Sequence, residues 1–537
     1  MKILFWILIF FALLSIFLIH TEYFRSIFFF LLISLAILVL LLDLLRTKIE
    51  TQTPMFIFQI LAVLILIRII PLVFIPGFYL DDPYYHEWFS SMIVLNHFIP
   101  IDTSYSPFPI MHLLLSISQI VTNASFKFVG TLFLTVLQAL LIPIFIYLIS
   151  KKIFNNLQIS LIAALIFGFS DIAIGQSIVG PFPTTYAIII ISLIFLIFMI
   201  KKDIRFSILI FLLSFTLIIS HSLSALIFEL FIIFIFICLT IAERIKIKTI
   251  SNFELTTILI FSISFILYWI FASNLIFEKF VEIGFGEVGG VKASFSSSGG
   301  ISYAQLIPVY EYILELSGKF FYFGFALVGL LFSIRTLKDS IFQLIIIVFG
   351  LLLFFIGGIG LIFAFGIAPD RILYYSYFFL AIPATIGIIL LFKHNSHNHY
   401  IFMIIAFLFI SLMITNSVSN KDSPIFSSDF TSKRYIDYTE RISVDTMIRY
   451  SSNSRIISDN DLSNYIKYIK DHDSVMIPFN SPKFENYKGS IIITRAYFQK
   501  YPIYSKGLYR INYEPAIKIP NSGFSHVYDS KIMNMYV

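Results

Sequence analysis

The stretch GFYLDDPYYHEWF, residues 77–89, decides how the chain is interpreted. Two adjacent carboxylates, Asp81 and Asp82, follow a long apolar run and precede a proline, two tyrosines and His86. The whole chain has 58% hydrophobic and 13% charged residues and a mean hydropathy of +0.92. This composition excludes a soluble globular protein. The question is therefore what requires two acids at the edge of a membrane.

Apolar stretches of about 20 residues, the length that crosses the hydrocarbon core, recur along most of the chain. The first of them has no small-residue cleavage site, so we expect a retained span and not a signal peptide. The short piece 108–121 is typical of a re-entrant or interfacial helix. We predict thirteen spans, at 4–20, 24–44, 54–76, 127–149, 157–174, 184–200, 204–220, 222–242, 255–275, 319–335, 341–366, 372–392 and 400–418.

The loop charges predict the orientation. With a cytoplasmic N-terminus, most lysines and arginines of 1–418 fall in inner loops, as the positive-inside rule requires. The loops 77–126 and 276–318 and the tail 419–537 then face outward. The tail is rich in polar residues and holds one helical and four strand-like segments. We therefore predict an all-α, multi-pass plasma-membrane protein with a small α/β extracytoplasmic C-terminal domain.

The net charge of +6 is divided between the loops and the tail, so no nucleic-acid partner is predicted. The single cysteine, Cys238, lies within a predicted span and excludes both an intramolecular disulfide and a cysteine-cluster metal site.

The two aspartates are the first candidates for chemistry. Asp82 would serve as a helix N-cap with Pro83 at the first helical position, but this explains Asp82 and leaves Asp81 unexplained. Adjacent carboxylates raise each other's pKa or hold a cation, which suits a general base or a metal ligand. His86 follows Asp82 by four residues and falls on the same helix face. We favour a functional role, with Asp82 as the candidate metal ligand.

Other charged or polar residues lie at predicted outer ends of spans. Arg371 suits a phosphate because its guanidinium matches phosphate geometry, and the alternative is an interfacial arginine paired with Asp370. His221 stands at the tip of a tight outer turn, while a deeper carboxylate, Glu229, would favour a transporter if it moved protons. Asp171 is expected in a polar surface turn. In YSPFPIMH, 105–112, the prolines are expected to shape the loop. The alternative is a functional segment in which His112 faces a lipid headgroup.

These features together resemble the GT-C superfamily of integral-membrane glycosyltransferases. DDPYYH, 81–86, is similar to the acidic motif of archaeal oligosaccharyltransferase catalytic subunits, and YSPFPIMH resembles a Tyr-Pro-Pro pattern of the wider superfamily, which includes protein mannosyltransferases. The order of parts is also similar: many spans, an acidic external loop, an interfacial helix, a flexible external loop and a soluble external domain. The terminal HVYDSKIMNMYV, 526–537, resembles the last strand of several such proteins.

The resemblance implies a sugar donor carried on a polyprenyl phosphate and a glycan, lipid or protein acceptor. Asp81 or Asp82 would deprotonate the acceptor, which attacks the anomeric carbon with inversion. Arg371, with Lys279 or a divalent cation (Mg²⁺ or Mn²⁺), would stabilise the leaving phosphate. The loop 276–318 would close over the donor. The residues expected to bind substrate are His86, Arg371, His221, Tyr85 and Lys279.

The sequence also departs from the oligosaccharyltransferase pattern. Its three tryptophans, Trp6, Trp88 and Trp269, all lie outside the tail, and the next external loop offers only Asp171, which argues against protein N-glycosylation. The alternatives are an O-antigen-polymerase or ligase type of enzyme, a secondary transporter, and a non-enzymatic membrane scaffold.

Overall fold

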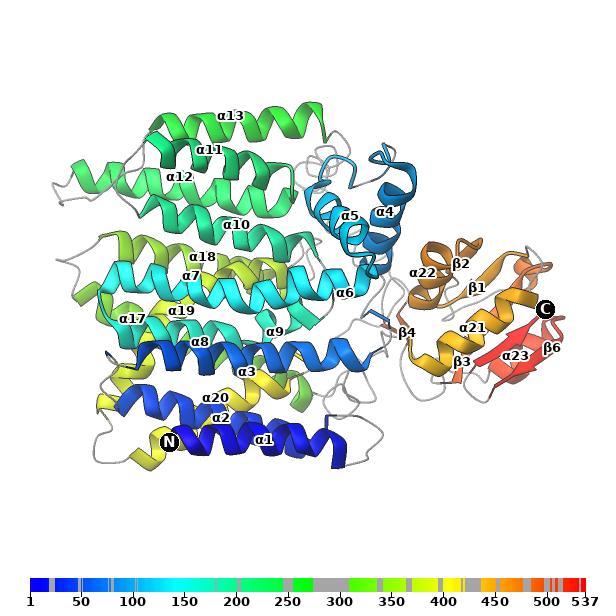
Figure 1. The fold of residues 1–537 in the computed structure, drawn as a ribbon, viewed down its shortest axis with the longest axis horizontal. Coiled ribbons are helices and arrows are strands. Elements are labelled where there is room, and N and C mark those ends of the chain that lie inside the picture. Colours follow the sequence, from blue (N-terminus) through cyan, green and yellow to red (C-terminus); the bar gives the residue numbers. More distant parts are fainter. Residues whose placement is uncertain are drawn as a thin grey trace.

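A computed structural model of the chain shows a large bundle of helices with a smaller α/β unit beyond one end (Figure 1). The structure describes residues 1–18, 25–46, 50, 52–75, 77–78, 82–101, 103, 105–178, 180, 182–199, 204–244, 255–273, 309–335, 341–363, 369–394, 399–416, 419–420, 436–450, 454–476, 484–496, 503–504, 508–509, 515–530 and 533–537.

An apolar helix lies at each of the thirteen predicted spans. Among the described residues, six helices are long and apolar enough to cross a membrane, or seven if the bent pair α8–α9 is one span. The chain is therefore a multi-pass membrane protein. The bundle contains α1 (Lys2–Leu18), α2 (Ile27–Arg46), α3 (Thr53–Phe74), α6 (Phe126–Gly130), a π-helical segment (Thr131–Val136), α7 (Leu137–Phe154), α8 (Leu157–Phe169), α9 (Asp171–Ile178), α10 (Pro183–Phe198), α11 (Ile204–Ile218), α12 (Ser222–Arg244), α13 (Leu255–Phe271), α17 (Val309–Arg335), α18 (Ile341–Phe363), α19 (Pro369–His394) and α20 (His399–Thr415).

The helix α19 is the most deeply packed of the candidate spans, with 83% of its apolar stretch buried. It lies very close to α17. A Cβ atom on Gly329 would sit 1.9 Å from the Pro383 carbonyl oxygen, and one on Gly387 would sit 2.1 Å from the Phe325 carbonyl oxygen. Small residues allow such close approach in membranes, where dispersion contacts rather than hydrophobic exclusion hold helices together. The first turn of α19 thus belongs to a tightly held helix.

The bend of 53° between α8 and α9 is stabilised by a buried arginine. Arg68 on α3 donates from Nε to Ser177 Oγ (3.0 Å) and from Nη2 to the Gly168 carbonyl oxygen (2.6 Å). The prediction that Asp171 lies in a polar surface turn is wrong. Asp171 is fully buried at the bend, where it pairs with Lys319 Nζ (3.2 Å) and accepts from Asn416 (2.8 Å), because an ionised carboxylate inside the bundle requires such partners.

The C-terminal region forms a mixed sheet with helices, as predicted. Its strand order is β2-β1-β3-β7-β6, in which β1 pairs in parallel with β2 and β3, and β7 pairs antiparallel with β3 and β6. A second, two-stranded sheet joins β4 to β5. The elements are α21 (Tyr438–Tyr450), β1 (Ile456–Ser458), α22 (Asn460–Ile469), β2 (Ser474–Met476), a 3₁₀ turn (Phe484–Tyr487), β3 (Ile491–Arg495), β4 (Ile503–Tyr504), β5 (Leu508–Tyr509), α23 (Pro515–Asn521), β6 (His526–Asp529) and β7 (Met533–Tyr536).

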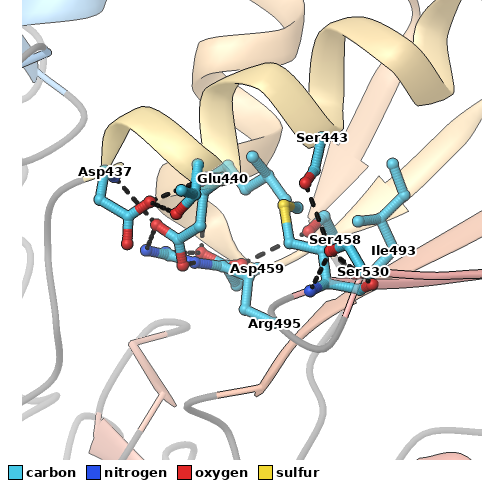
Figure 2. A network of polar contacts seen from close by, with 11 residues as sticks. Asp437, Glu440, Ser443, Ser458, Asp459, Ile493, Arg495 and Ser530 are labelled. Carbon is cyan, nitrogen blue, oxygen red and sulfur yellow. Dashed lines mark hydrogen bonds and ion pairs between the residues drawn. The ribbon is translucent and has the colours of Figure 1, made fainter.

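A buried ion cluster ties two of these helices to the sheet (Figure 2). Arg495 on β3 holds Glu440 with two hydrogen bonds of 2.9 and 3.0 Å, and its Nη1 lies 3.4 Å from Asp459. Glu440 belongs to a capping box at the start of α21, because it and Asp437 accept each other's backbone N–H. Asp459 caps α22 by accepting from the Leu462 N–H. The arginine therefore fixes both helix N-termini.

Two helices between α3 and α6 connect the bundle to the α/β unit. They are α4 (Asp82–Asn96) and α5 (Ile110–Thr122), and Figure 1 shows both at the end of the bundle that faces the C-terminal region. Tyr84 on α4 packs edge-on against Tyr465 on α22, with ring centroids 5.4 Å apart, inside an apolar cluster shared by both parts. The α/β unit thus supports α4 directly.

Candidate functional site

The site is built around Asp82 at the first position of α4. Its Oδ2 lies 3.6 Å from Nη2 of Arg371, which stands in the first turn of α19. Both side chains are about one-third exposed, at 34% and 32%, so a ligand can reach the pair. The positive end of the α19 dipole also favours an anion near Arg371. An acid and a guanidinium from opposite parts of the chain thus meet at one accessible point.

A pair of buried histidines lies on the other side of Asp82. His86 Nε2 is 3.8 Å from Asp82 Oδ1, one helical turn away, and His86 Nδ1 is 2.8 Å from Nε2 of His112 on α5. Both imidazoles are fully buried. Burial lowers the pKa of His86 to about 3, with a further contribution from the Arg371 charge. Burial and then His86 likewise hold the pKa of His112 well below its ordinary value, so both rings are neutral at physiological pH.

A third buried histidine supports Arg371. His221, directly before α12, places Nε2 3.5 Å from Arg371 Nη1 and 3.4 Å from Thr184 Oγ1. Its Nδ1 lies 2.6 Å from Ser224 Oγ, which in turn contacts the Tyr375 hydroxyl on α19. Burial, together with the nearby Arg371 charge, keeps the pKa of His221 well below its ordinary value. A neutral imidazole places no second positive charge beside the guanidinium, and its Nδ1 accepts a hydrogen bond from the Ser224 backbone N–H (3.2 Å).

Aromatic side chains surround this polar centre. The Tyr105 ring lies 4.7 Å from the His86 ring, and burial followed by the Asp82 charge raises the pKa of the Tyr105 hydroxyl. Tyr85 packs beside the same Tyr105 ring, with centroids 5.6 Å apart, and also beside the rings of Trp88 at 5.5 Å and of Tyr468 on α22 at 5.2 Å.

The structure brings four of the predicted site residues into one polar network: Asp82, His86, Arg371 and His221. Tyr85 lies beside it through Tyr105. Asp81 and Lys279 are outside the described residues. Glu229 lies deeper in α12, where Ser262 donates a hydrogen bond to it (2.5 Å).

Sequence reasoning missed several members of the network. His112 does not face a lipid headgroup, because its ring is buried against His86. Its place at the end of the proline-rich segment 105–112 indicated a constrained position but did not indicate its partner, His86. Tyr105 opens the YSPFPIMH segment, which indicated a special position but not the contact with His86, whereas Ser224 and Tyr375 carried no signal, because hydroxyl-bearing residues are common in spans.

The described residues around Asp82 do not by themselves form a site for Mg²⁺ or Mn²⁺, and the neighbouring Asp81 lies outside the described part of the chain. These hard cations take several oxygen ligands. The described part of the chain offers no group of three or more His, Cys, Asp or Glu side chains that could hold a metal ion. Asp82 supplies a single carboxylate, whose two oxygens face a guanidinium and an imidazole.

Comparison with known proteins gives a similarity of overall structure. No family model matches the sequence, and no curated protein does. The chain is similar to the archaeal oligosaccharyltransferase AglB from Archaeoglobus fulgidus, solved with an inhibitory peptide and a dolichol-phosphate, with 12% identity and a TM-score of 0.48 over 91% of this chain and 75% of that one. It is also similar to ArnT from Cupriavidus metallidurans, bound to undecaprenyl phosphate, with 9% identity and a TM-score of 0.49 over 91% of this chain and 98% of that one. These similarities describe the course of the chain and assign no residue a role.

Proposed function

We propose that the chain is a membrane glycosyltransferase that moves a sugar from a polyprenyl-phosphate donor to an acceptor glycan, lipid or protein on the outer face of the membrane. The observation that carries the proposal is the accessible Asp82–Arg371 pair, 3.6 Å apart, with a neutral histidine behind each partner. Thirteen crossings and a cytoplasmic N-terminus belong to the same proposal, because they place this pair at the outer surface.

Arg371 is suited to the donor phosphate. Its Nη1 and Nη2 point to different partners, so the guanidinium is held in one orientation, and its planar fork would match phosphate oxygens once Asp82 is displaced. Phosphate binding would compete with Asp82 for this cation. The donor would thereby release the Asp82 carboxylate from its ion pair and leave it free to act on the acceptor.

Asp82 is suited to act as the general base. Its carboxylate would take the proton of the acceptor hydroxyl as that oxygen attacks the anomeric carbon from the face opposite the phosphate. The bond between the anomeric carbon and the phosphate oxygen breaks, and its electron pair passes to the lipid phosphate. Arg371 would stabilise the charge that grows there, and a single displacement inverts the anomeric configuration. Asp81 is the neighbouring alternative for the base.

The function is tested by reconstituting the purified chain in liposomes with a panel of radiolabelled polyprenyl-phosphate sugars. We expect at least one donor to lose its label from the lipid phase, with the product sugar in the inverted configuration when its anomeric proton is examined by NMR. Retention of configuration would contradict the single displacement. Movement of intact lipid-linked sugar across the bilayer without bond cleavage would indicate a transporter instead.

A further inference from the structure

We infer that His221 is a second ligand of the donor phosphate, because its Nε2–H and the N–H groups on Nη1 of Arg371 stand side by side and together suit a single phosphate oxygen. This inference rests on the proposed function for the identity of the anion, and it adds a neutral N–H group to the cation. It follows from three observations: the hydrogen bond between His221 Nδ1 and the start of α12, the 3.5 Å separation of Nε2 from Nη1, and the burial of the ring.

The first step is the position of the imidazole proton. His221 directly precedes α12, and its Nδ1 accepts the backbone N–H of Ser224 at 3.2 Å, as the side chain of an N-cap residue does. A nitrogen that accepts a hydrogen bond uses its lone pair, so Nδ1 carries no proton. Burial holds the pKa of His221 well below its ordinary value, so the ring is neutral and its one N–H is at Nε2.

The other tautomer is unfavourable at this position. A proton on Nδ1 would face the Ser224 backbone N–H, and an N–H in the first turn of a helix has no acceptor within the helix. Ser224 Oγ, 2.6 Å from Nδ1, is compatible with the Nε2–H form, because the Ser224 hydroxyl can donate to the ring while the Tyr375 hydroxyl donates to Ser224. The first turn of α12 therefore fixes which nitrogen of His221 bears the proton.

The second step is that two N–H-bearing nitrogens meet. A guanidinium has no acceptor, and His221 Nε2 has none once it is protonated, so neither can accept from the other across their 3.5 Å separation. Thr184 Oγ1 lies 3.4 Å from Nε2, which is longer than an ordinary N–H···O hydrogen bond, so the Nε2–H is only weakly held. Two neighbouring N–H groups, one of them cationic, favour an anionic oxygen beside both.

The exposure of the two side chains gives the direction of entry. His221 is 5% exposed and the Arg371 side chain is 32% exposed, so the anion would enter from the arginine side. One phosphate oxygen would bind to Nη1 and Nε2, while Nη2 still faces Asp82. A phosphate held in this way would compete with Asp82 for Nη2 from a bound position. His221 would thus help the donor to release the carboxylate.

Two substitutions separate the phosphate contact from the helix cap. His221→Asn keeps a side-chain oxygen for the Ser224 N–H, because asparagine is a preferred N-cap residue, but it is too short to replace Nε2. His221→Gln places an amide N–H at a reach similar to that of Nε2 and weakens the cap. The matched control is Ser220→Ala, which removes the buried hydroxyl that donates to the Thr216 carbonyl oxygen and leaves the imidazole in place.

The experiment measures binding of farnesyl phosphate, a short polyprenyl phosphate, to the full chain in lipid nanodiscs by calorimetry. We expect the Kd to rise about 10–100-fold in His221→Asn, the range for one hydrogen bond to a charged group. His221→Gln should recover most of the affinity, and Ser220→Ala should stay near the wild-type Kd. With ¹⁵N-histidine, the resonances that are absent from His221→Asn should show a proton on Nε2 in the wild type.

Parallel titrations with inorganic phosphate and dihexanoyl phosphatidic acid identify the source of the anion. Weaker binding of both than of farnesyl phosphate would support the donor lipid as the source. Equal affinity for all three would overturn the assignment to the donor phosphate, because the site would then select any phosphate group.

Two further results would overturn the inference: a wild-type His221 protonated at Nδ1, or a Kd for farnesyl phosphate that changes equally in His221→Asn and Ser220→Ala. The proposed function fails separately. If farnesyl phosphate binds with the expected dependence on His221 while the wild type releases no sugar from any donor, the transferase proposal falls and the phosphate contact stands.

Discussion

Replacement of Arg371 is the perturbation whose outcome follows most directly from the geometry. The guanidinium uses two nitrogens in two directions, with Nη2 3.6 Å from Asp82 and Nη1 3.5 Å from His221. Lysine keeps the charge but has one nitrogen, so Arg371→Lys loses the planar fork. Arg371→Gln loses the charge as well. Removing one preorganised donor to a developing oxyanion costs about 10²–10³-fold in kcat. We expect kcat to fall about 10²–10³-fold in Arg371→Gln and about 10–10²-fold in Arg371→Lys.

The assay is single-turnover release of labelled sugar from the polyprenyl phosphate, with saturating donor so that chemistry is observed. The matched control is Arg455→Gln, which removes an exposed arginine from its pair with Asp473 in the C-terminal region. Loss of folding should not confound the result, because partly exposed ion pairs such as Asp82–Arg371 contribute only about 0–1 kcal/mol to stability. An Arg371→Gln rate within threefold of the wild type would show that Arg371 does not stabilise the leaving phosphate. An Arg371→Lys rate equal to the wild type would show that charge alone suffices without the planar fork.

Three further predictions concern stability, pH and metals. Arg495→Met removes the buried arginine from Glu440 and Asp459 and should destabilise the C-terminal region by about 3–5 kcal/mol. Hydrogen exchange measures this against Arg455→Met, and equal protection in both variants would contradict the buried cluster. His86 has a folded-state pKa of about 3, below its unfolded value near 6.5, so the folded state should lose up to about 1.4 kcal/mol for each pH unit below 6.5. The melting temperature should therefore fall more steeply between pH 6 and 4 in the wild type than in His86→Gln, and parallel curves would show that burial of His86 carries no such cost. If the Asp82 carboxylate acts as the base without a divalent cation, sugar release should be unchanged by EDTA, and a loss restored by Mg²⁺ or Mn²⁺ would show that a cation takes part.

Much of the fold was predictable because its signals are local. Apolar length alone located a helix at each predicted span, and alternation and turn residues located most strands of the C-terminal sheet. The helix α22 was missed although Asp459 supplies a capping residue before it and Leu462, Tyr465, Ile466 and Ile469 follow helical spacing, so its signal was present in the sequence. The burial of Asp171 could not be predicted, since it depends on a bend whose partners, Lys319 and Asn416, come from distant helices.

In the candidate site too, contacts within one helix were predictable from the sequence, whereas contacts between helices were not. The relation of Asp82 to His86 was predictable from a spacing of four residues on a helix. The contacts of Asp82 with Arg371 and of His86 with His112 were not, because each joins helices whose packing is set by side chains along their whole length. Residue types indicated which groups suit phosphate and proton chemistry, and the tertiary structure was needed to show that they meet.

The central claim is that sugar leaves a polyprenyl phosphate with the help of the Asp82 carboxylate. The most direct test measures release of label from the lipid by the wild type, by Asp82→Asn and by the surface control Asp473→Asn, in the same liposomes. We expect release by the wild type and by Asp473→Asn, and a loss of at least about 10²-fold in Asp82→Asn, the lower end of what a general base contributes. Release by Asp82→Asn at the wild-type rate would contradict it.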